Sequence, residues 1–522
     1  MAILRPLASL AAFVALTGAT VAHAQTDTRV SVTDTAIVEY HADNRDGDPD
    51  EDNYTTLINR LNLTGNAGDI EASVRVDGFV FIDAPTNEFR DRLSLERISV
   101  GWSRNDWEVE AGDFYEQLGR GILLSVRKID EAGVDIAIRG GTVSYRGDDH
   151  RARVFAGRSN PANIDTVNQH AVPDADDVII GGAYELRALD PVDISVFGVY
   201  VEPNTSFYDT ASSIVQDSLC CEARQDRHLG TGIAFDMPSL TNWLSLYFEG
   251  DTQEHLERGE VSRGWGGYGT ADLQFGDTGI LFEGIYLDEM YMDGSPNPAT
   301  GNAFSYVQPP TLERIDQEVF NVRSFYGGRA RVSQYIYSAD LNLYASGMYR
   351  IQDPDADNEV TQVHVFGGME LYYDVGASRV NVSAGWRDED ITGAGDSRDF
   401  KDMIHFEGDW VQSVGTGWAF HLTTDNQLRT LEGDDYARGS TFVGVERNGL
   451  GALTFEYGYD TQNQADGVAN HFYAGILRAE AGEHVIVQAV GGTQRGGIKC
   501  VNGVCREYPG FAGGRVEVIS RF

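Results

Sequence analysis

The sequence predicts an all-β protein, a single transmembrane antiparallel β-barrel of about 24 strands within a range of about 20 to 26. Three observations lead to this fold class. From Arg29 onward the chain falls into runs of about ten residues in which apolar and polar side chains alternate. The connections between these runs alternate strictly between short and long. No segment after Gln25 approaches the roughly 18 consecutive apolar residues that a membrane-spanning helix needs.

The first 24 residues have the pattern of a secretory signal peptide. Arg5 supplies a positive charge, an apolar run extends from Leu7 to Val21, and the small-residue site Ala22-His23-Ala24 precedes Gln25. We expect cleavage at this site. Residues 25–522 contain no linker or low-complexity tract that would divide them, so we predict one barrel domain.

The alternation is clear in residues 70–82, where the apolar side chains share one parity and Glu71, Arg75 and Asp77 hold the other. This pattern alone also fits a half-buried strand of a soluble sheet. The connections favour a membrane barrel, because such barrels have short periplasmic turns and longer external loops. Short turns are expected at residues 66–69, 103–106, 147–150, 189–191, 238–242, 276–279, 338–340, 375–378, 413–417, 447–451 and 481–483. The longer segments are 41–53, 83–91, 113–132, 158–177, 202–228, 290–323 and further ones towards the C-terminus.

The final strand, from Gly514 to Phe522, carries Val516 and Val518 on the face that ends in Phe522. A terminal aromatic residue resembles the signal by which bacterial outer-membrane barrels are recognised for insertion, so we expect barrel-assembly machinery and outer-membrane lipid as partners. In lipid an open sheet edge would leave backbone groups unpaired, so the first strand should pair with the last. That first strand begins so close to Gln25 that we expect no separate plug domain.

The alternation is interrupted within the stretch from Trp107 to Lys128, where it stops at Asp113. The following residues include two aromatics, two glycines and a Glu/Arg pair, a composition unlike a strand or a solvated loop. We predict that residues 113–132 form the third external loop and fold into a lumen that 24 strands leave too wide for side chains to fill. The residues expected at the constriction are Phe114, Tyr115, Glu116, Gln117, Arg120, Arg127, Lys128 and Asp130. The alternative is that Phe114, Tyr115 and Leu118 pack the loop against the wall, while Glu116 and Arg120 only pair with neighbouring strands.

The chain is strongly acidic, with 80 Asp and Glu, 40 Lys and Arg, and a formal net charge of -40. Phosphate binding needs a basic surface, so this composition argues against a nucleic-acid partner. It suits a surface that gathers cations and predicts a cation preference for a pore. Genome composition or a salty habitat would produce the same excess.

Cys500 and Cys505 enclose Val501-Asn502-Gly503-Val504, and Asn-Gly is the strongest signal for a two-residue hairpin turn. In such a hairpin the cysteines form a non-hydrogen-bonded pair with Cα atoms about 4.5 Å apart, within disulfide range. We predict this disulfide bond, in an external loop. Cys220 and Cys221 are adjacent and could be free, bonded to each other or paired elsewhere.

The first long loop carries carboxylates at nearly alternate positions, a spacing that can converge on Ca²⁺. These residues are Asp43, Asp46, Asp48, Asp50 and Asp52. Residues 352–359 have a similar composition, but neither stretch has the glycine and terminal glutamate of an EF-hand. A solvated acidic loop is therefore the competing interpretation of a Ca²⁺ site, and we expect no other cofactor.

No catalytic constellation is visible in the linear sequence. The histidines are scattered, and neither an HExxH motif nor a GxSxG nucleophile elbow occurs. We therefore expect no enzymatic activity. A hydrolase site assembled from distant strands, as in outer-membrane lipases and proteases, would escape a search by spacing.

The segment from Gly112 to Gly121, GDFYEQLGRG, is followed by Gly133-Val134-Asp135 and Arg139-Gly140. It resembles the signature of a family of uncharacterised bacterial outer-membrane β-barrel proteins with a GDFYEQxGRG-type motif, catalogued as a domain of unknown function and common in Bacteroidota. The resemblance is specific over about Gly112 to Arg146 and architectural elsewhere. It implies a barrel and the outer membrane, and it supplies no substrate and no catalytic residues.

Two functions follow from this fold. The first is a porin-like channel or transporter for small solutes, cations among them. The alternative is a non-conducting barrel that anchors or scaffolds surface machinery, or that binds a ligand through its long external loops.

Overall fold

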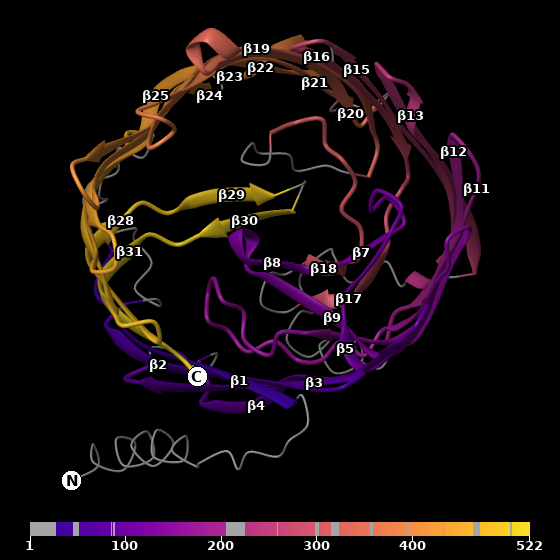
Figure 1. Ribbon diagram of the computed structural model, residues 1–522, viewed down its shortest axis with the longest axis horizontal. Coiled ribbons are helices and arrows are strands. Elements are labelled where there is room, and N and C mark those ends of the chain that lie inside the picture. The colour runs from indigo at the N-terminus through magenta and orange to yellow at the C-terminus, as the bar shows by residue number, and fades with distance from the viewer. Residues whose placement is uncertain are drawn as a thin grey trace.

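The computed structural model describes residues 28–44, 52–84, 86, 89–204, 225–257, 259–297, 302–314, 323–354, 359–393, 396–431, 433–462, 470–501 and 504–522. Within these residues the fold is a closed barrel of 24 antiparallel strands, seen end-on in Figure 1. The expected signal peptide lies outside the described residues.

The wall strands follow one another around the ring in chain order. They are β1 (Thr28–His41), β2 (Tyr54–Ala67), β3 (Ile70–Ile82), β4 (Arg92–Arg104), β5 (Trp107–Phe114), β9 (Val134–Arg146), β10 (His150–Pro161), β11 (Val178–Leu189), β12 (Val192–Glu202), β13 (Gln225–Thr241), β14 (Leu244–Glu257), β15 (Glu260–Phe275), β16 (Thr278–Asp288), β19 (Phe325–Ile336), β20 (Leu341–Gln352), β21 (Glu359–Tyr373), β22 (Ser378–Gly393), β23 (Asp396–Val414), β24 (Trp418–Leu431), β25 (Asp434–Arg447), β26 (Gly451–Asp460), β27 (His471–Ala481), β28 (Val485–Gln494) and β31 (Phe511–Arg521).

The ring closes between its first and last strands. β31 pairs with β28 on one side and with β1 on the other, where Ile37 lies opposite Glu517. The expected short turns separate consecutive wall strands, although β13 runs through Thr241 and shortens the turn expected at 238–242. The predicted fold class is confirmed, including the strand number and the closure.

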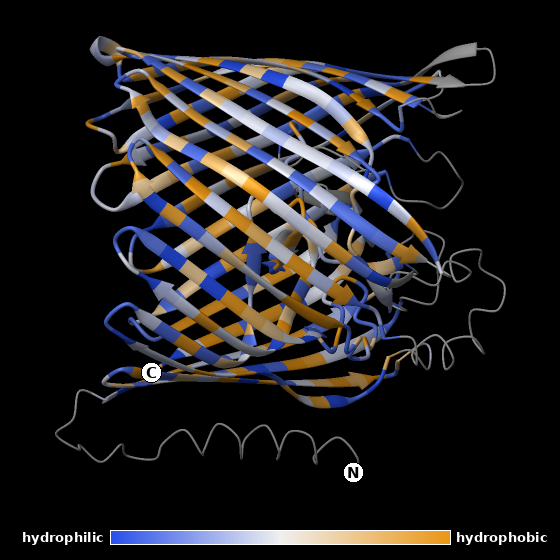
Figure 2. Ribbon diagram, turned by 90° about the vertical axis from the view of Figure 1, so that its right-hand side faces the viewer, coloured by the Kyte–Doolittle hydropathy of each residue, from blue (hydrophilic) through white to orange (hydrophobic). Residues whose placement is uncertain are grey.

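The outer surface of the wall is apolar, as contact with hydrocarbon requires. Leu93, Val154, Leu428 and Leu453 are each more than 60% exposed on it. Figure 2 shows how hydrophobic and hydrophilic residues alternate along the tilted strands. The opposite parity points into the barrel, where on β3 both Asp77 and Phe79 are buried.

A β-bulge in β4 alters this alternation where charged residues are needed inside. The register between β3 and β4 shifts at Arg75, so that Arg75 faces Arg97 while Val76 faces Leu95, and Glu96 is the extra residue. Glu96 and Arg97 are consecutive, yet both are buried. Leu95 before the bulge and Ile98 after it nevertheless both remain exposed on the outside.

Several loop segments fold into the ring, as Figure 1 shows. The loop after β5 contains β6 (Glu116–Leu118), β7 (Leu124–Val126), β8 (Lys128–Ile129) and the 3-10 helix η2 (Asp130–Ala132). The loop between β16 and β19 contains β17 (Asp293–Asn297) and β18 (Asn302–Ser305), and the segment before β31 contains β29 (Gly497–Val501) and β30 (Val504–Tyr508). The 3-10 helix η4 (Tyr337–Ala339) is a turn between wall strands. No helix in the described ranges is long and apolar enough to cross a membrane.

The main hydrophobic core lies inside the barrel, between these inner segments and the wall. It joins buried residues of the 113–132 loop, such as Leu123, and of the loop after β16, such as Met292, to wall residues including Ile179, Val199 and Phe325. A smaller cluster joins Ile164 of the 158–177 loop to Ile37, Ile58 and Phe79 on β1 to β3.

Candidate functional site

The 113–132 loop is fixed to the inner wall by a β-hairpin and its apolar tip. In the hairpin, Glu116 of β6 pairs with Val126 of β7. Ile122, Leu123 and Leu124 at the tip are almost completely buried in the main core. Burying each such side chain contributes about 1.5–3 kcal/mol, which holds the loop against the wall.

The polar residues expected at the constriction are held by specific partners. Glu116 is buried, and its carboxylate lies 2.9 Å from Arg153 on β10. Burial raises the pKa of Glu116, and the charge of Arg153 offsets only part of that effect. The Tyr115 hydroxyl donates to Asp135 at 2.8 Å, and burial together with that carboxylate raises the pKa of Tyr115 to about 12.

The remaining constriction residues lie along the same loop. The Arg120 backbone N–H donates to Glu249 at 2.9 Å, and its guanidinium lies 4.3 Å from the centroid of the Tyr247 ring. Arg127 donates to Gln308, and Lys128 lies 2.5 Å from Asp130. Lys128, Asp130 and Gln117 are exposed, and Phe114 is buried in the core. The loop therefore combines wall-packing contacts with a set of exposed polar side chains.

The GDFYEQLGRG stretch and the residues after it assemble into one structural cluster. The Asp113 carboxylate accepts hydrogen bonds from the Ile98 N–H at 2.8 Å, from Arg139 at 3.0 Å and from Asn160 at 2.8 Å. Asp135 accepts from Arg97 at 2.6 Å. Asp113 and Asp135 therefore bind Ile98 and Arg97, the two residues that follow Glu96 at the bulge.

Two glycines of this cluster mark close backbone contacts. A Cβ on Gly112 would lie 2.1 Å from the carbonyl oxygen of Ile98, and one on Gly140 would lie 2.0 Å from that of Ala156. Gly112 also has a φ of +117°, which L-residues rarely adopt. These positions require glycine because neighbouring strands touch there.

The loop between β16 and β19, called the 289–324 loop below, is hydrogen-bonded to the 113–132 loop. The Ser125 N–H donates to the Tyr306 carbonyl at 2.7 Å, and the Gln308 N–H donates to that of Gly121 at 2.9 Å. The Tyr306 hydroxyl donates to the buried carboxylate of Asp177 at 2.5 Å. Burial raises the pKa of Asp177, against the effect of its hydrogen bonds from Ser295 and Tyr306. The two loops therefore form one layer inside the barrel.

A chain of ionisable groups fastens Glu313 and Arg314 of the 289–324 loop to the wall. His364 Nδ1 lies 2.7 Å from Glu313, the Nε2 atoms of His364 and His405 lie 3.0 Å apart, and His405 Nδ1 lies 3.0 Å from Glu407. Arg314 donates to both oxygens of Glu407, at 2.7 and 2.5 Å. An ionised carboxylate only accepts hydrogen bonds, so the Nδ1 atoms of His364 and His405 can donate to Glu313 and Glu407.

A second histidine pair holds the start of the same loop. The Nδ1 atoms of His228 and His255 lie 2.7 Å apart, and His255 Nε2 lies 3.0 Å from the Glu289 carbonyl. The Tyr291 ring stacks on His255 with centroids 4.1 Å apart. The 289–324 loop is therefore attached to histidines of the wall at Glu289 and at Glu313.

Two further segments fold inward that the sequence did not identify as inner loops. In the 158–177 loop, Gln169 accepts a hydrogen bond from Thr56 at 2.7 Å. β29 and β30 lie across the interior against η2, as Figure 1 shows. The hairpin expected in an external loop thus lies inside the barrel. Its backbone register pairs Cys500 with Cys505 and Val501 with Val504, and their side chains lie outside the described residues.

Two lumenal cavities lined by described residues lie beside the inner loops. The first, of about 730 Å³, lies between residues 310–314 and the inner faces of β16 and β19 to β24. The second, of about 690 Å³, is bordered by β1 to β3, β25 to β28 and β31 together with Asp130 and residues 166–169. Of the eight expected constriction residues, Asp130 borders the second cavity and none borders the first.

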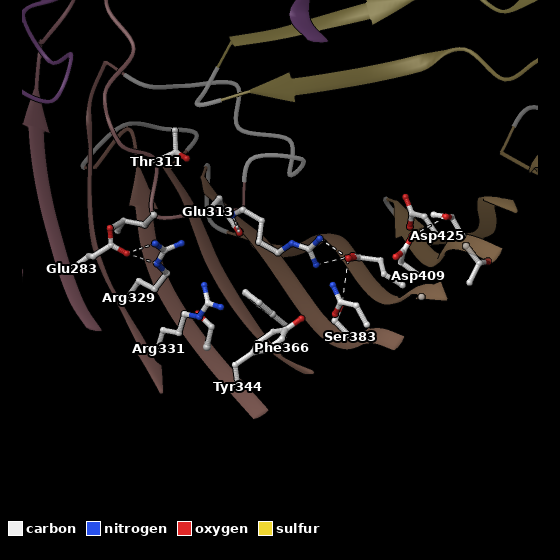
Figure 3. Close-up of a pocket in the computed structure, with 18 of the residues that line it drawn as sticks. Glu283, Thr311, Glu313, Arg329, Arg331, Tyr344, Phe366, Ser383, Asp409 and Asp425 are labelled. Atoms are coloured by element: carbon white, nitrogen blue, oxygen red, sulfur yellow. Dashed lines mark hydrogen bonds and ion pairs between the residues drawn. The ribbon is translucent and has the colours of Figure 1, made fainter. Parts of the chain in front are cut away.

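Charge is distributed unevenly around the first cavity, as Figure 3 shows. Arg329 and Arg331 lie at one end, with Arg329 paired to Glu283. Asp409 and Asp425 lie at the other end. Tyr344 and Phe366 supply aromatic surface between them. An elongated solute can therefore contact cationic, aromatic and anionic groups at once.

The sequence did not identify these cavity residues. Arg331, Tyr344 and Ser346 occupy ordinary alternating positions in strands, and a single lumen-facing residue has the same sequence pattern as any other. The one available signal was parity, which assigns them to the polar face but does not show which strands face an inner loop.

The other expected sites have these positions. Phe522 is 62% exposed, and its backbone exchanges two hydrogen bonds of 2.9 Å with Val32 on β1.

Among the acidic residues of the first long loop, Asp43 and Asp52 are described, and the Asn44 N–H donates to Asp52 at 3.2 Å. Asp46, Asp48 and Asp50 lie outside the described residues, as do Cys220 and Cys221. In the ranges that the structure covers, no group of three or more His, Cys, Asp or Glu is arranged to hold a metal ion.

Comparison with known proteins supports the architecture. A family model described as a family of unknown function (DUF6029) matches residues 4–194, a range that includes the 113–132 loop. No curated protein sequence matches the chain.

Among solved structures, a chain of the E. coli P pilus tip assembly intermediate PapC-PapD-PapK-PapG is similar with a TM-score of 0.52. It is 10% identical over 96% of this chain, which spans 62% of that chain. The siderophore receptor PirA from Pseudomonas aeruginosa has a TM-score of 0.49 at 8% identity, covering 96% of this chain and 81% of that one. OccK5 (OpdH) from Pseudomonas aeruginosa has a TM-score of 0.39 at 10% identity, covering 77% and 98%. The first of these similarities supports the barrel fold.

Proposed function

We propose that the protein is an outer-membrane channel or transporter for small solutes, in which the inner loops narrow the lumen. The observation that carries this proposal is the pair of polar cavities, of about 730 and 690 Å³, left between the inner loops and the wall. Both are large enough for small organic solutes. The apolar outer surface and the closed hydrogen-bonding ring support a position in a membrane.

The inner layer formed by the 113–132 and 289–324 loops is the proposed constriction. Its backbone hydrogen bonds, from Ser125 to Tyr306 and from Gln308 to Gly121, keep the two loops together. The first cavity lies beside this layer, so a solute passing there would contact residues 310–314 on one side and the wall on the other.

Conductance measurements with thiol labelling test this function. We expect purified protein to conduct KCl in planar bilayers. In a Thr423→Cys variant, a sulfonate-bearing methanethiosulfonate reagent should reduce the conductance, because Thr423 is exposed and borders the first cavity. The matched control is Leu428→Cys on the same strand, because Leu428 is 61% exposed on the lipid side. Wild-type protein treated with the reagent controls for the four natural cysteines.

The second candidate is a non-conducting barrel that anchors or scaffolds surface machinery or binds a ligand through its loops. The interlocked inner loops favour it, because they occupy much of the interior in Figure 1. Absence of conductance from correctly folded protein, together with a partner that co-purifies in fixed ratio, would support this candidate over a channel.

A further inference from the structure

Among the described residues, Arg331 at the first cavity has no ion-pair partner. Three arginines border this cavity, and Arg314 and Arg329 pair with Glu407 and Glu283. Arg331 is exposed, and no ion pair joins it to a carboxylate among the described residues. Its guanidinium lies 5.1 Å from the centroid of the Tyr344 ring. An arginine positioned in this way can bind a carboxylate through two parallel hydrogen bonds.

A buried hydroxyl without a partner lies next to this arginine. Ser346 on β20 stands opposite Arg331 on β19 in the strand register. Ser346 is 4% exposed and borders the cavity, and its Oγ has no hydrogen-bond partner within the described structure. Buried hydroxyl groups are normally hydrogen-bonded, because leaving one unpaired costs about 1–3 kcal/mol. A ligand oxygen at this position would satisfy the hydroxyl.

The rest of the lining suits a hydroxylated molecule. Tyr344 and Phe366 provide apolar surface beside Arg331, and Asn381, Ser383 and Thr423 provide amide and hydroxyl groups further along the wall. Neighbouring strands lie about 4.8 Å apart, so β22 is about 14 Å from β19 along the wall. Two linked sugar units have a comparable length. The acidic Asp409 and Asp425 beyond them accept hydrogen bonds from ligand hydroxyls and disfavour a second carboxylate.

We propose that the first cavity binds an acidic sugar, with its single carboxylate held by Arg331 and Ser346 and its hydroxylated body extending over Tyr344 towards β22. This inference rests on the proposed channel function, because it names the solute class for that lumen. A local anion site is compatible with an acidic barrel. The net charge changes the concentrations of all small ions, whereas Arg331 contacts only a solute bound in the cavity.

Calorimetric titration with two matched probes tests the site. Lactobionate and lactitol share their hydroxylated body and differ in that lactobionate carries a carboxylate. We expect wild-type protein in detergent to bind lactobionate at least about tenfold more tightly than lactitol, since a charge-assisted pair contributes at least that difference. Arg331→Gln should remove this preference by weakening lactobionate binding to about the level of lactitol binding, and Ser346→Ala should weaken lactobionate binding by a smaller factor.

Arg187→Gln is the matched control, because Arg187 belongs to β11, forms ion pairs with Glu185 and Asp193, and borders neither cavity. Equal binding of both probes by wild-type protein, or an unchanged preference in folded Arg331→Gln protein, overturns the inference. KCl conductance measured on the same preparations separates the two proposals. Conductance without selective lactobionate binding overturns the acidic-sugar site alone, and selective binding without conductance overturns the channel alone.

Discussion

At the scale of single residues, Glu313 connects an inner loop to the wall. It is buried, its carboxylate lies 2.7 Å from His364 Nδ1, and its other oxygen lies 3.5 Å from Arg387 Nε. Burial raises the pKa of this loop residue, but the hydrogen bond from His364 and the charge of Arg387 outweigh burial and lower the pKa to about 2. Because the folded-state pKa is depressed, the ionised carboxylate stabilises the fold above its ordinary pKa of about 4.5. This stabilisation is lost as the pH falls from about 4.5 through about 2.

We predict that Glu313→Gln releases the 289–324 loop. The substitution leaves His364 and Arg387 without their shared carboxylate, and breaking a buried ion pair costs about 3–5 kcal/mol. Limited trypsin digestion of folded protein at neutral pH should then cleave after Arg314, and wild-type protein should resist. Wild-type protein held in acid within that pH window should also release the loop. If this released state is trapped before neutral pH is restored, trypsin should cleave it after Arg314 as well.

The matched control for this prediction is Glu254→Gln. Glu254 forms an exposed ion pair with Arg263 at 3.3 Å, a type worth less than about 1 kcal/mol. Cleavage after Arg314 that is as fast in Glu254→Gln as in Glu313→Gln, or that is absent from both, would show that Glu313 does not secure the loop.

Residue-level prediction from the sequence was possible where composition was unusual and was not possible where composition was ordinary. The 113–132 loop was recognisable because Phe114, Tyr115 and Glu116 interrupt an alternating pattern. Glu313, His364 and His405 are far apart in the chain and lie in unremarkable contexts. Their contact depends on which part of the 289–324 loop reaches which wall strand, and strand alternation contains no information about that.

At the scale of elements, the neighbouring strands β4, β5, β9 and β10 contact one another at Asp113 and Gly140, close to the Glu96 bulge. We predict that Gly140→Ala destabilises the barrel, because the new Cβ would lie 2.0 Å from the Ala156 carbonyl oxygen on β10. Overpacking of this kind typically costs about 1–3 kcal/mol. Gly475→Ala on β27 is the matched control, since nothing lies within 4 Å of its Cβ position. The temperature at which each protein loses its compact, heat-modifiable form on gel electrophoresis measures the effect, and equal temperatures would contradict it.

The β29–β30 hairpin is the element for which the sequence predicts the register and the long connection, and does not predict that the hairpin folds inward. The Asn-Gly turn predicts the pairing of Cys500 with Cys505, and the backbone has that pairing. Hairpin sequence does not determine whether a hairpin points outward or inward, and here β29 and β30 lie against η2 inside the ring.

The disulfide between Cys500 and Cys505 remains a prediction. Non-reducing peptide mapping of native protein should show these two residues in one cross-linked peptide, because directly opposed cysteines of an antiparallel pair are within bonding distance. Recovery of both as free thiols from protein kept under oxidising conditions would refute it.

At the scale of the whole molecule, strand number and closure were predictable because lipid permits few solutions. In a membrane barrel, apolar and polar side chains alternate along each strand, the first and last strands pair, and short turns alternate with longer loops. Each of these requirements is visible in residues 28–522. The filled interior was less predictable. Loops that pack inside a barrel, such as 158–177, bury residues like Ile164 against the wall and have no membrane constraint that would mark them.

The net charge of -40 leads to a prediction for the whole barrel. An excess of negative charge on the protein raises the local concentration of cations, so we expect the channel to prefer K⁺ over Cl⁻. A reversal potential measured across a KCl gradient should have the sign for cation selectivity and should decrease at high salt, where charge is screened. A reversal potential of the opposite sign would reject the prediction.

Because β1 pairs with β31, the ring of wall strands is closed, and no strand lies at an edge. Thr33 lies opposite Arg521, and both strands reach the short-turn end of the barrel there. A short linker from Phe522 to Thr28 would therefore act as one more turn, and the chain could start instead at the turn between β13 and β14. Such a circular permutant would keep every wall pairing while reversing the order in which the two halves leave the ribosome.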